Sequence, residues 1–184
     1  MNINWVLSNS AMIDPTISID RLKDIGSFWG SWQTWRGCQT DNVICHDMAK
    51  VDELIKRAFH SICNFYISNS VYQSLDRPMG VKIYEGDFIH DVDHQEEIIA
   101  MHLAASTNEI VLLLGFDFSI KPVLEDKLLE HRATNYRNLV RQVIKDNSLI
   151  QWVIVDHPEP LSPDFAMLDN LTKDTMDNVL KLLD

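Results

Sequence analysis

The sequence predicts a three-layer α/β domain in which helices cover both faces of a mostly parallel sheet of five or six strands. β-rich apolar segments alternate along the chain with amphipathic segments. One of them, Ile110–Leu114 (IVLLL), lacks polar alternation, which is typical of a central strand covered on both faces. The 184 residues contain no linker, repeat or low-complexity tract, so we expect residues 1–184 to form one domain.

The first half of the chain predicts two strands and two helices in alternation. Residues 3–7 (INWVL) predict a strand, and residues 17–32 are interpreted as a helix. Residues 42–45 predict the next strand. Residues 48–62 give the clearest helix, because their apolar side chains form a single stripe. That stripe consists of Val51, Leu54, Ile55, Ala58, Phe59 and Ile62.

The second half continues the alternation. Besides Ile110–Leu114, three apolar segments predict strands, at residues 64–67, 81–85 and 149–155. Three segments predict helices, at residues 96–105, 122–145 and 173–183. Right-handed crossovers between parallel strands bring all their carboxyl ends to one side of the sheet.

Four of the predicted strands run out into an aspartate, namely Asp47, Asp87, Asp117 and Asp156. Open α/β sheets bind ligands at the edge where these carboxylates would gather. Close carboxylates raise each other's pKa unless a cation or hydrogen-bond donors offset them. We therefore predict Mg²⁺ ligands at Asp47, Asp117 and Asp156, with Asp117 as an alternative general base. The competing interpretation is that each aspartate caps a helix or builds a turn.

Two histidines adjoin these acids, His46 beside Asp47 and His157 beside Asp156. A histidine beside a carboxylate at a strand end can act as a base, a proton shuttle or a metal ligand. We predict His46, His157 and Asp117 as catalytic residues. Plain surface histidines are the alternative.

The turn after the first strand carries Ser8, Asn9 and Ser10, whose side chains we expect to contact a polar ligand. In many doubly wound folds this turn approaches phosphate. The patterns G-x-G-x-x-G and G-x4-G-K-[ST] are both absent, which argues against a dinucleotide or P-loop site.

Other groups support weaker hypotheses. The loop from His90 to His94 could bind a metal, or Asp93 could cap the next helix. Arg137 and Arg141 lie one turn apart and could collect an anion or form a solvated face. The five tryptophans could stack a base or sugar, anchor the core or join a homo-oligomer.

The composition limits the partners and the compartment. A net charge of −11 argues against nucleic acid and anionic membranes as partners. No apolar run approaches the roughly 20 residues of a membrane span, and residues 1–10 lack the features of a signal peptide. Three cysteines without close spacing predict neither a disulfide framework nor a zinc site, and a cytoplasmic location is expected.

Two segments, residues 110–119 (IVLLLGFDFS) and 43–54 (VICHDMAKVDEL), resemble elements of the 6-hydroxymethylpterin diphosphokinase-like family. That family is related to motility accessory factor proteins and to a group of bacterial sialyltransferases. Its hydrophobic strand ends in a turn that Gly115, Phe116 and Asp117 would match. Tyr136, which we predict as a ligand contact, would match a tyrosine further along the family's chain. The family's Gly-rich first loop is absent here. The resemblance implies a Rossmann-like fold more than an activity.

Two hypotheses about function follow. In the first, the domain binds a nucleotide or nucleotide-sugar and acts as a transferase or hydrolase, with Mg²⁺ as Lewis acid and charge clamp. In the second, the chain is a non-catalytic protein that binds a small polar ligand or assembles into oligomers.

Overall fold

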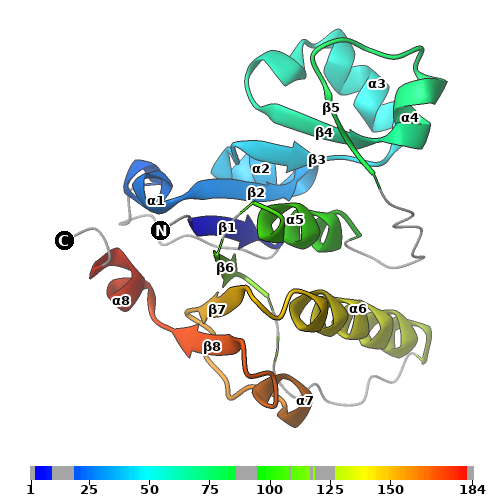
Figure 1. Ribbon diagram of the computed structural model, residues 1–184. Helices are drawn as coiled ribbons and strands as arrows, with labels where there is room; N and C mark the ends of the chain where they lie inside the picture. Colours follow the sequence, from blue (N-terminus) through cyan, green and yellow to red (C-terminus); the bar gives the residue numbers. More distant parts are fainter. Residues whose placement is uncertain are drawn as a thin grey trace.

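In the computed structural model, the part of the chain that the structure describes contains one eight-stranded sheet (Figure 1). The described residues are 3–9, 19–85, 95–107, 109–116, 118 and 127–181. The strands are β1 (Ile3–Leu7), β2 (Ser27–Ser31), β3 (Asn42–Ile44), β4 (Asn64–Ser68), β5 (Lys82–Tyr84), β6 (Ile110–Leu114), β7 (Gln151–Val155) and β8 (Leu171–Asp174). All neighbouring strands are parallel. The predicted α/β class and Rossmann-like architecture are confirmed, with eight strands instead of five or six.

Helices cover both faces of this sheet. They are α1 (Ile19–Ile25), α2 (Trp32–Cys38), α3 (Met48–Lys56), the 3₁₀ helix η1 (Phe59–Ser61), α4 (Asn69–Ser74), α5 (Gln95–Ala105), α6 (Lys127–Asp146), α7 (Pro163–Ala166) and α8 (Met176–Leu180). In Figure 1, α5 and α6 lie next to each other on one face. On the opposite face, side chains of α1, α2 and α8 share one core cluster. Side chains of α3 and α4 cover the outer strands on that same face.

The strand order β5-β4-β3-β2-β1-β6-β7-β8 contains one reversal of direction. The chain moves outward from β1 to β5, returns through α5 to β6 on the other side of β1, and then moves outward again. α5 packs over β1, β2 and β3 on this return. The topological switch point, where such sheets bind ligands, therefore lies at the carboxyl ends of β1 and β6.

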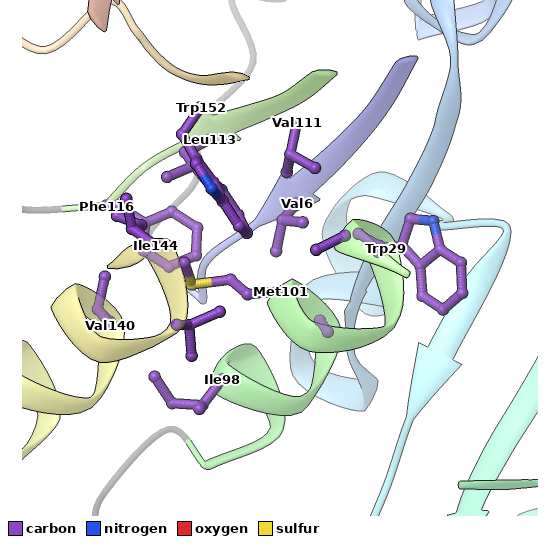
Figure 2. Close-up of a cluster of buried hydrophobic side chains, with 14 of the residues drawn as sticks. Val6, Trp29, Ile98, Met101, Val111, Leu113, Phe116, Val140, Ile144 and Trp152 are labelled. Atoms are coloured by element: carbon purple, nitrogen blue, oxygen red, sulfur yellow. The ribbon is translucent and has the colours of Figure 1, made fainter. Parts of the chain in front are cut away.

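The largest core cluster lies between the sheet and the pair α5 and α6. Figure 2 shows side chains from the central strands facing those of the two helices. The strands contribute Val6, Val111, Leu113 and Trp152, and the helices contribute Ile98, Met101, Val140 and Ile144. Because α5 is covered by both the sheet and α6, it is apolar around most of its surface.

The structure corrects the predicted helix at residues 17–32. That stretch contains α1, then β2, and α2 follows directly. Gly26 makes the change of direction possible, because a Cβ there would lie 2.1 Å from the carbonyl oxygen of Ile3. The glycine lets the end of α1 approach β1 closely, and Phe28 and Trp29 are then buried as strand residues.

Two further boundaries differ from prediction. The helix predicted over residues 48–62 ends at Lys56, and Ala58 adopts a positive φ of 55° before η1. This break lets Phe59 pack edge-on against Phe65 and Trp35. The helix predicted from residue 173 is instead the edge strand β8 followed by α8, because pairing with β7 buries Leu171. Among the described residues, no helix is long and apolar enough to span a membrane.

Candidate functional site

Ser8 joins the two strands that flank the switch point. Its backbone N–H donates to the carbonyl oxygen of Leu114 at 3.0 Å, and its buried hydroxyl donates to that of Gly115 at 2.6 Å. Gly115 has a φ of 80°, a conformation that glycine adopts without a steric penalty. The carboxyl ends of β1 and β6 are therefore fixed to each other.

Asn9, the next residue, connects this point to α2 and α5. Its Oδ1 accepts hydrogen bonds from the hydroxyls of Ser31 at 2.5 Å and Thr34 at 2.9 Å. Ser31 also caps α2, since its Oγ accepts from the backbone N–H of Thr34. The backbone N–H of Asn9 donates to Glu97 Oε1 at 2.5 Å.

Glu97 is the buried centre of this network, with only 2% of its surface exposed. Its second oxygen accepts from the hydroxyl of Tyr136 at 2.5 Å. Two sequence-predicted ligand contacts, Asn9 after β1 and Tyr136 on α6, are thus tied to one carboxylate in the first turn of α5. A carboxylate is favourable there, because the helix amino terminus carries partial positive charge.

The preceding residue, Glu96, binds a third predicted residue. Its Oε1 lies 3.1 Å from the backbone nitrogen of His46 and 3.3 Å from the ring nitrogen Nδ1. The hydrogen bond to Glu96 raises the pKa of His46, with partial burial acting in the opposite direction. Burial, followed by the charge of Glu96, also raises the pKa of the neighbouring thiol of Cys45, which disfavours a reactive thiolate.

Asp47 and Asp156 both hold backbone amides. Asp47 caps α3, because Oδ1 accepts from the N–H of Lys50 at 2.7 Å. Asp156 has a φ of 54°, and its Oδ1 accepts from the N–H of Met176, at the start of α8, at 2.8 Å. This geometry agrees with the capping interpretation, although it leaves the other carboxylate oxygen of each residue for further contacts.

Of the predicted metal ligands, the described residues include Asp47 and Asp156. Within the described ranges, no group of three or more His, Cys, Asp and Glu side chains is placed to hold a metal ion. The predicted residues Asp117 and Ser10 lie outside the described residues, as do Asp87 and the loop from His90 to His94.

His157 is buried and joins two loops. Its Nε2 lies 3.1 Å from the backbone N–H of Phe118, and its Nδ1 lies 2.8 Å from the carbonyl oxygen of Glu159. An N–H donor on one side and a carbonyl acceptor on the other assign the neutral tautomer with the proton on Nδ1. Both ring nitrogens are therefore engaged by the backbone.

Two of the cavities that described residues line open at this edge of the sheet. One, of about 320 Å³, is lined at the ends of β6 and β7 by Gly115, Phe116, Asp156, His157 and Glu159. The other, of about 450 Å³, is lined near β3 by Trp32, Cys45, Asp47, Lys50, Glu53 and Glu96. Both sizes lie in the range of small-molecule sites.

The remaining hypotheses have structural answers. Trp5, Trp29 and Trp152 are buried in the core, and Trp32 and Trp35 stack on each other at 5.6 Å. The core interpretation is thus confirmed for Trp5, Trp29 and Trp152, whereas Trp32 and Trp35 are partly buried and pack against the cluster of the outer strands. Arg137 donates to Ser162 at 2.6 Å and lies 3.6 Å from Asp164, so its partners are within the chain.

Sequence reasoning missed Glu96 and Glu97. Two acids in the first turn of a helix are usually exposed and compensate the helix dipole, so the residues alone give no reason to single them out. Their one unusual feature is that an otherwise apolar helix follows directly, which predicts burial for the whole turn.

The fold and the site together define a Rossmann-like α/β protein with a polar, acid-rich carboxyl edge. Comparison with known proteins found no matching family model, no matching curated protein and no matching solved structure. The resemblance to the 6-hydroxymethylpterin diphosphokinase-like family therefore stays a prediction.

Proposed function

We propose that this protein binds a small polar ligand of the nucleotide or nucleotide-sugar type at the carboxyl edge of its sheet. The observation that carries the proposal is that two cavities open on this edge, at the ends of β6 and β7 and near β3. They flank the switch point between β1 and β6, where parallel α/β sheets bind ligands.

The charge of the edge decides how a phosphate could bind there. Glu96, Asp47 and Asp156 are at or near the two cavities, while Lys50 is the basic residue among those lining the larger one. A bare phosphate group would be repelled, whereas a divalent cation would bridge it to the carboxylates. We therefore expect binding of phosphate-bearing ligands to depend on Mg²⁺, which would supply charge neutralisation and Lewis acidity for transfer or hydrolysis.

Thermal unfolding with ATP, UDP and UDP-glucose, each with and without Mg²⁺, tests this proposal. A ligand that binds only the folded state at 100 times its Kd stabilises it by about 2.7 kcal/mol. We expect stabilisation by at least one nucleotide and only with Mg²⁺. If none of the three ligands changes the unfolding temperature under either condition, the proposal is wrong.

Asn9→Asp provides a variant of the site. The new carboxylate can still accept the hydroxyls of Ser31 and Thr34, but it adds a negative charge at the switch point. Because an added carboxylate favours the cation, we expect stabilisation by nucleotides to need a lower Mg²⁺ concentration than in the wild type. Asn138→Asp adds the same charge at an exposed position of α6 and serves as the control, with stabilisation equal to the wild type.

A second candidate function is ligand binding without catalysis. It is favoured by the contacts of His157, Asp47 and Asp156, each of which holds backbone groups. ³¹P NMR of a stabilising nucleotide incubated with the protein separates the two candidates. New phosphorus resonances would establish turnover, and an unchanged spectrum would favour the non-catalytic protein.

A further inference from the structure

We propose that the smaller of the two cavities, at the ends of β6 and β7, is a nucleoside site in which the Asp156 carboxylate accepts the ribose hydroxyls. The inference rests on the proposed function, because it concerns one half of the same nucleotide-type ligand. It adds the part of the ligand that this cavity takes and the side chain that recognises ribose. It also gives Asp156 a role other than that of the predicted Mg²⁺ ligand.

The charge of this cavity disfavours phosphate and suits an uncharged, hydroxyl-bearing group. Among the described residues that line it, Asp156 and Glu159 are acids and none is Lys or Arg. Carboxylates repel a phosphate group, but they accept hydrogen bonds from hydroxyl groups. Lys50 lines the other cavity, together with Asp47 and Glu96. The phosphates and the cation are therefore better matched to the cavity near β3, and the nucleoside to the cavity at β6 and β7.

The Asp156 side chain has acceptor sites to spare. Its Oδ1 accepts from the backbone N–H of Met176 at 2.8 Å, and no other hydrogen bond of this carboxylate is present in the described part of the chain. A carboxylate offers about four acceptor sites on its two oxygens. The second oxygen is thus left for the neighbouring hydroxyls of a ribose, a contact that dinucleotide-binding α/β folds also make with an acidic residue.

The loop that carries Asp156 is held in place by hydrogen bonds from three directions. His157 Nε2 accepts from the backbone N–H of Phe118 at 3.1 Å, and Nδ1 donates to the carbonyl oxygen of Glu159 at 2.8 Å. That same carbonyl oxygen accepts from Lys173 Nζ, on β8, at 3.0 Å. A wall that is fixed before binding loses little conformational freedom when a ligand arrives. His157 is therefore a positioning residue for this cavity.

The remaining walls of the cavity are apolar. They include Phe116 and Val155, which are buried, and Pro158, which is exposed. A nucleoside combines a flat base, which suits an apolar wall, with the hydroxyls that suit Asp156. The volume of about 320 Å³ is at the lower end of the range of small-molecule sites, which fits a nucleoside better than a whole nucleotide sugar.

Titration calorimetry of the complete chain with nucleosides tests the inference. Adenosine and uridine are each compared with the 2′-deoxy form, all without Mg²⁺. We expect at least one ribonucleoside to bind. Its 2′-deoxy form should bind about 10 to 100 times more weakly, because it lacks one hydroxyl that donates to a charged acceptor.

Asp156→Asn removes the acceptor with little change of shape. The amide oxygen can still accept from the N–H of Met176, and asparagine tolerates the φ of 54° at this position. We expect the variant to bind the ribonucleoside as weakly as the 2′-deoxy form, with binding of the 2′-deoxy form unchanged. Asp177→Asn, exposed on α8, removes the same charge and is the matched control, which should keep the wild-type preference.

Three results would overturn the inference. They are equal binding of the ribose and 2′-deoxy forms, binding of neither nucleoside, and an Asp156→Asn variant that keeps the preference for ribose. The wild type alone decides the question if the variant fails to fold, because ¹H–¹⁵N NMR locates the nucleoside. Its addition should move the amide resonances of Gly115 and Glu159. Changes at Lys50 and Glu53 instead, in the other cavity, would place it elsewhere and contradict the inference.

Thermal unfolding with ATP and 2′-deoxy-ATP, each with Mg²⁺, separates this inference from the proposed function. If both stabilise the wild type and Asp156→Asn weakens both equally, Asp156 is a metal ligand and the ribose site alone is wrong. If a ribonucleoside binds as expected but none of ATP, UDP and UDP-glucose changes the unfolding temperature, the nucleoside site is supported and the proposed function is wrong. Binding of no nucleoside and no nucleotide would contradict both.

Discussion

At the scale of single residues, the two adjacent acids of α5 organise the candidate site. Glu96 holds His46, and Glu97 holds Asn9 and Tyr136. Both glutamates are buried, and a buried carboxylate is costly unless hydrogen bonds compensate it. The contacts that arrange the site are therefore also contacts that the folded state needs.

Tyr136→Phe measures how much the stability of the folded state depends on the hydrogen bonds of Glu97. The substitution removes the hydroxyl that donates to Glu97 Oε2 and leaves a buried carboxylate oxygen with one hydrogen bond fewer. We expect the free energy of unfolding to fall by about 1–3 kcal/mol, measured by urea denaturation. Tyr72→Phe is the control, because no hydrogen bond of the Tyr72 hydroxyl is present among the described residues. Equal losses in both variants would contradict the role of the Tyr136–Glu97 contact.

At the scale of elements, side-chain caps begin four of the short helices, and left-handed residues follow two of them. Ser31, Asp47, Ser68 and Thr175 cap α2, α3, α4 and α8. Gln39 and Ala58 adopt positive φ angles after α2 and α3. Each of these four helices follows a strand of the parallel sheet, so the capped amino termini lie at its carboxyl edge.

Asp47→Ala tests whether this aspartate is a cap. Loss of the hydrogen bond to the N–H of Lys50 should cost about 1 kcal/mol of stability in chemical denaturation. Asp47→Asn keeps an acceptor oxygen and should retain most of the stability. If Asn instead preserves stability but abolishes stabilisation by nucleotide with Mg²⁺, Asp47 is a metal ligand as well as a cap.

Two glycine substitutions test the close contact between the end of α1 and β1. Gly26 lies at that contact, and Gly37 in α2 serves as the matched control. In Gly26→Ala the new methyl group would meet the carbonyl oxygen of Ile3, and we expect a loss of about 1–3 kcal/mol or more. In Gly37→Ala nothing lies within 4 Å of the new methyl group, and the helix should gain about 0.5–1 kcal/mol. Thermal and urea unfolding of both variants measures the difference. A tolerated Gly26→Ala would show that α1 does not need its close approach to β1.

At the scale of the whole molecule, the sheet is most protected at its centre. β1 and β6 are covered on both faces, and their residues are almost entirely buried. β5 lies at one edge, has three residues and exposes Lys82 and Ile83. Stability against local opening should therefore fall from the centre of the sheet toward β5.

Native-state hydrogen exchange followed by NMR measures this gradient. We expect amides of β1 and β6 to exchange only through global unfolding, and those of β5 to exchange through local opening at much lower free energy. Uniform protection across all eight strands would contradict this picture.

The α/β class and most of the strands can be predicted from the residues alone, because apolar patterns and β-rich composition are local. β1 and β6 have the predicted boundaries. The local pattern predicts a helix where β2 lies, because the burial of β2 depends on the contact of Gly26 with β1. The polar groups that meet at the carboxyl edge are brought together by long-range packing. Glu96 lies 50 residues from His46, and Glu97 lies 88 residues from Asn9. The return of α5 across β3, β2 and β1 brings them together, and no local pattern encodes that crossing.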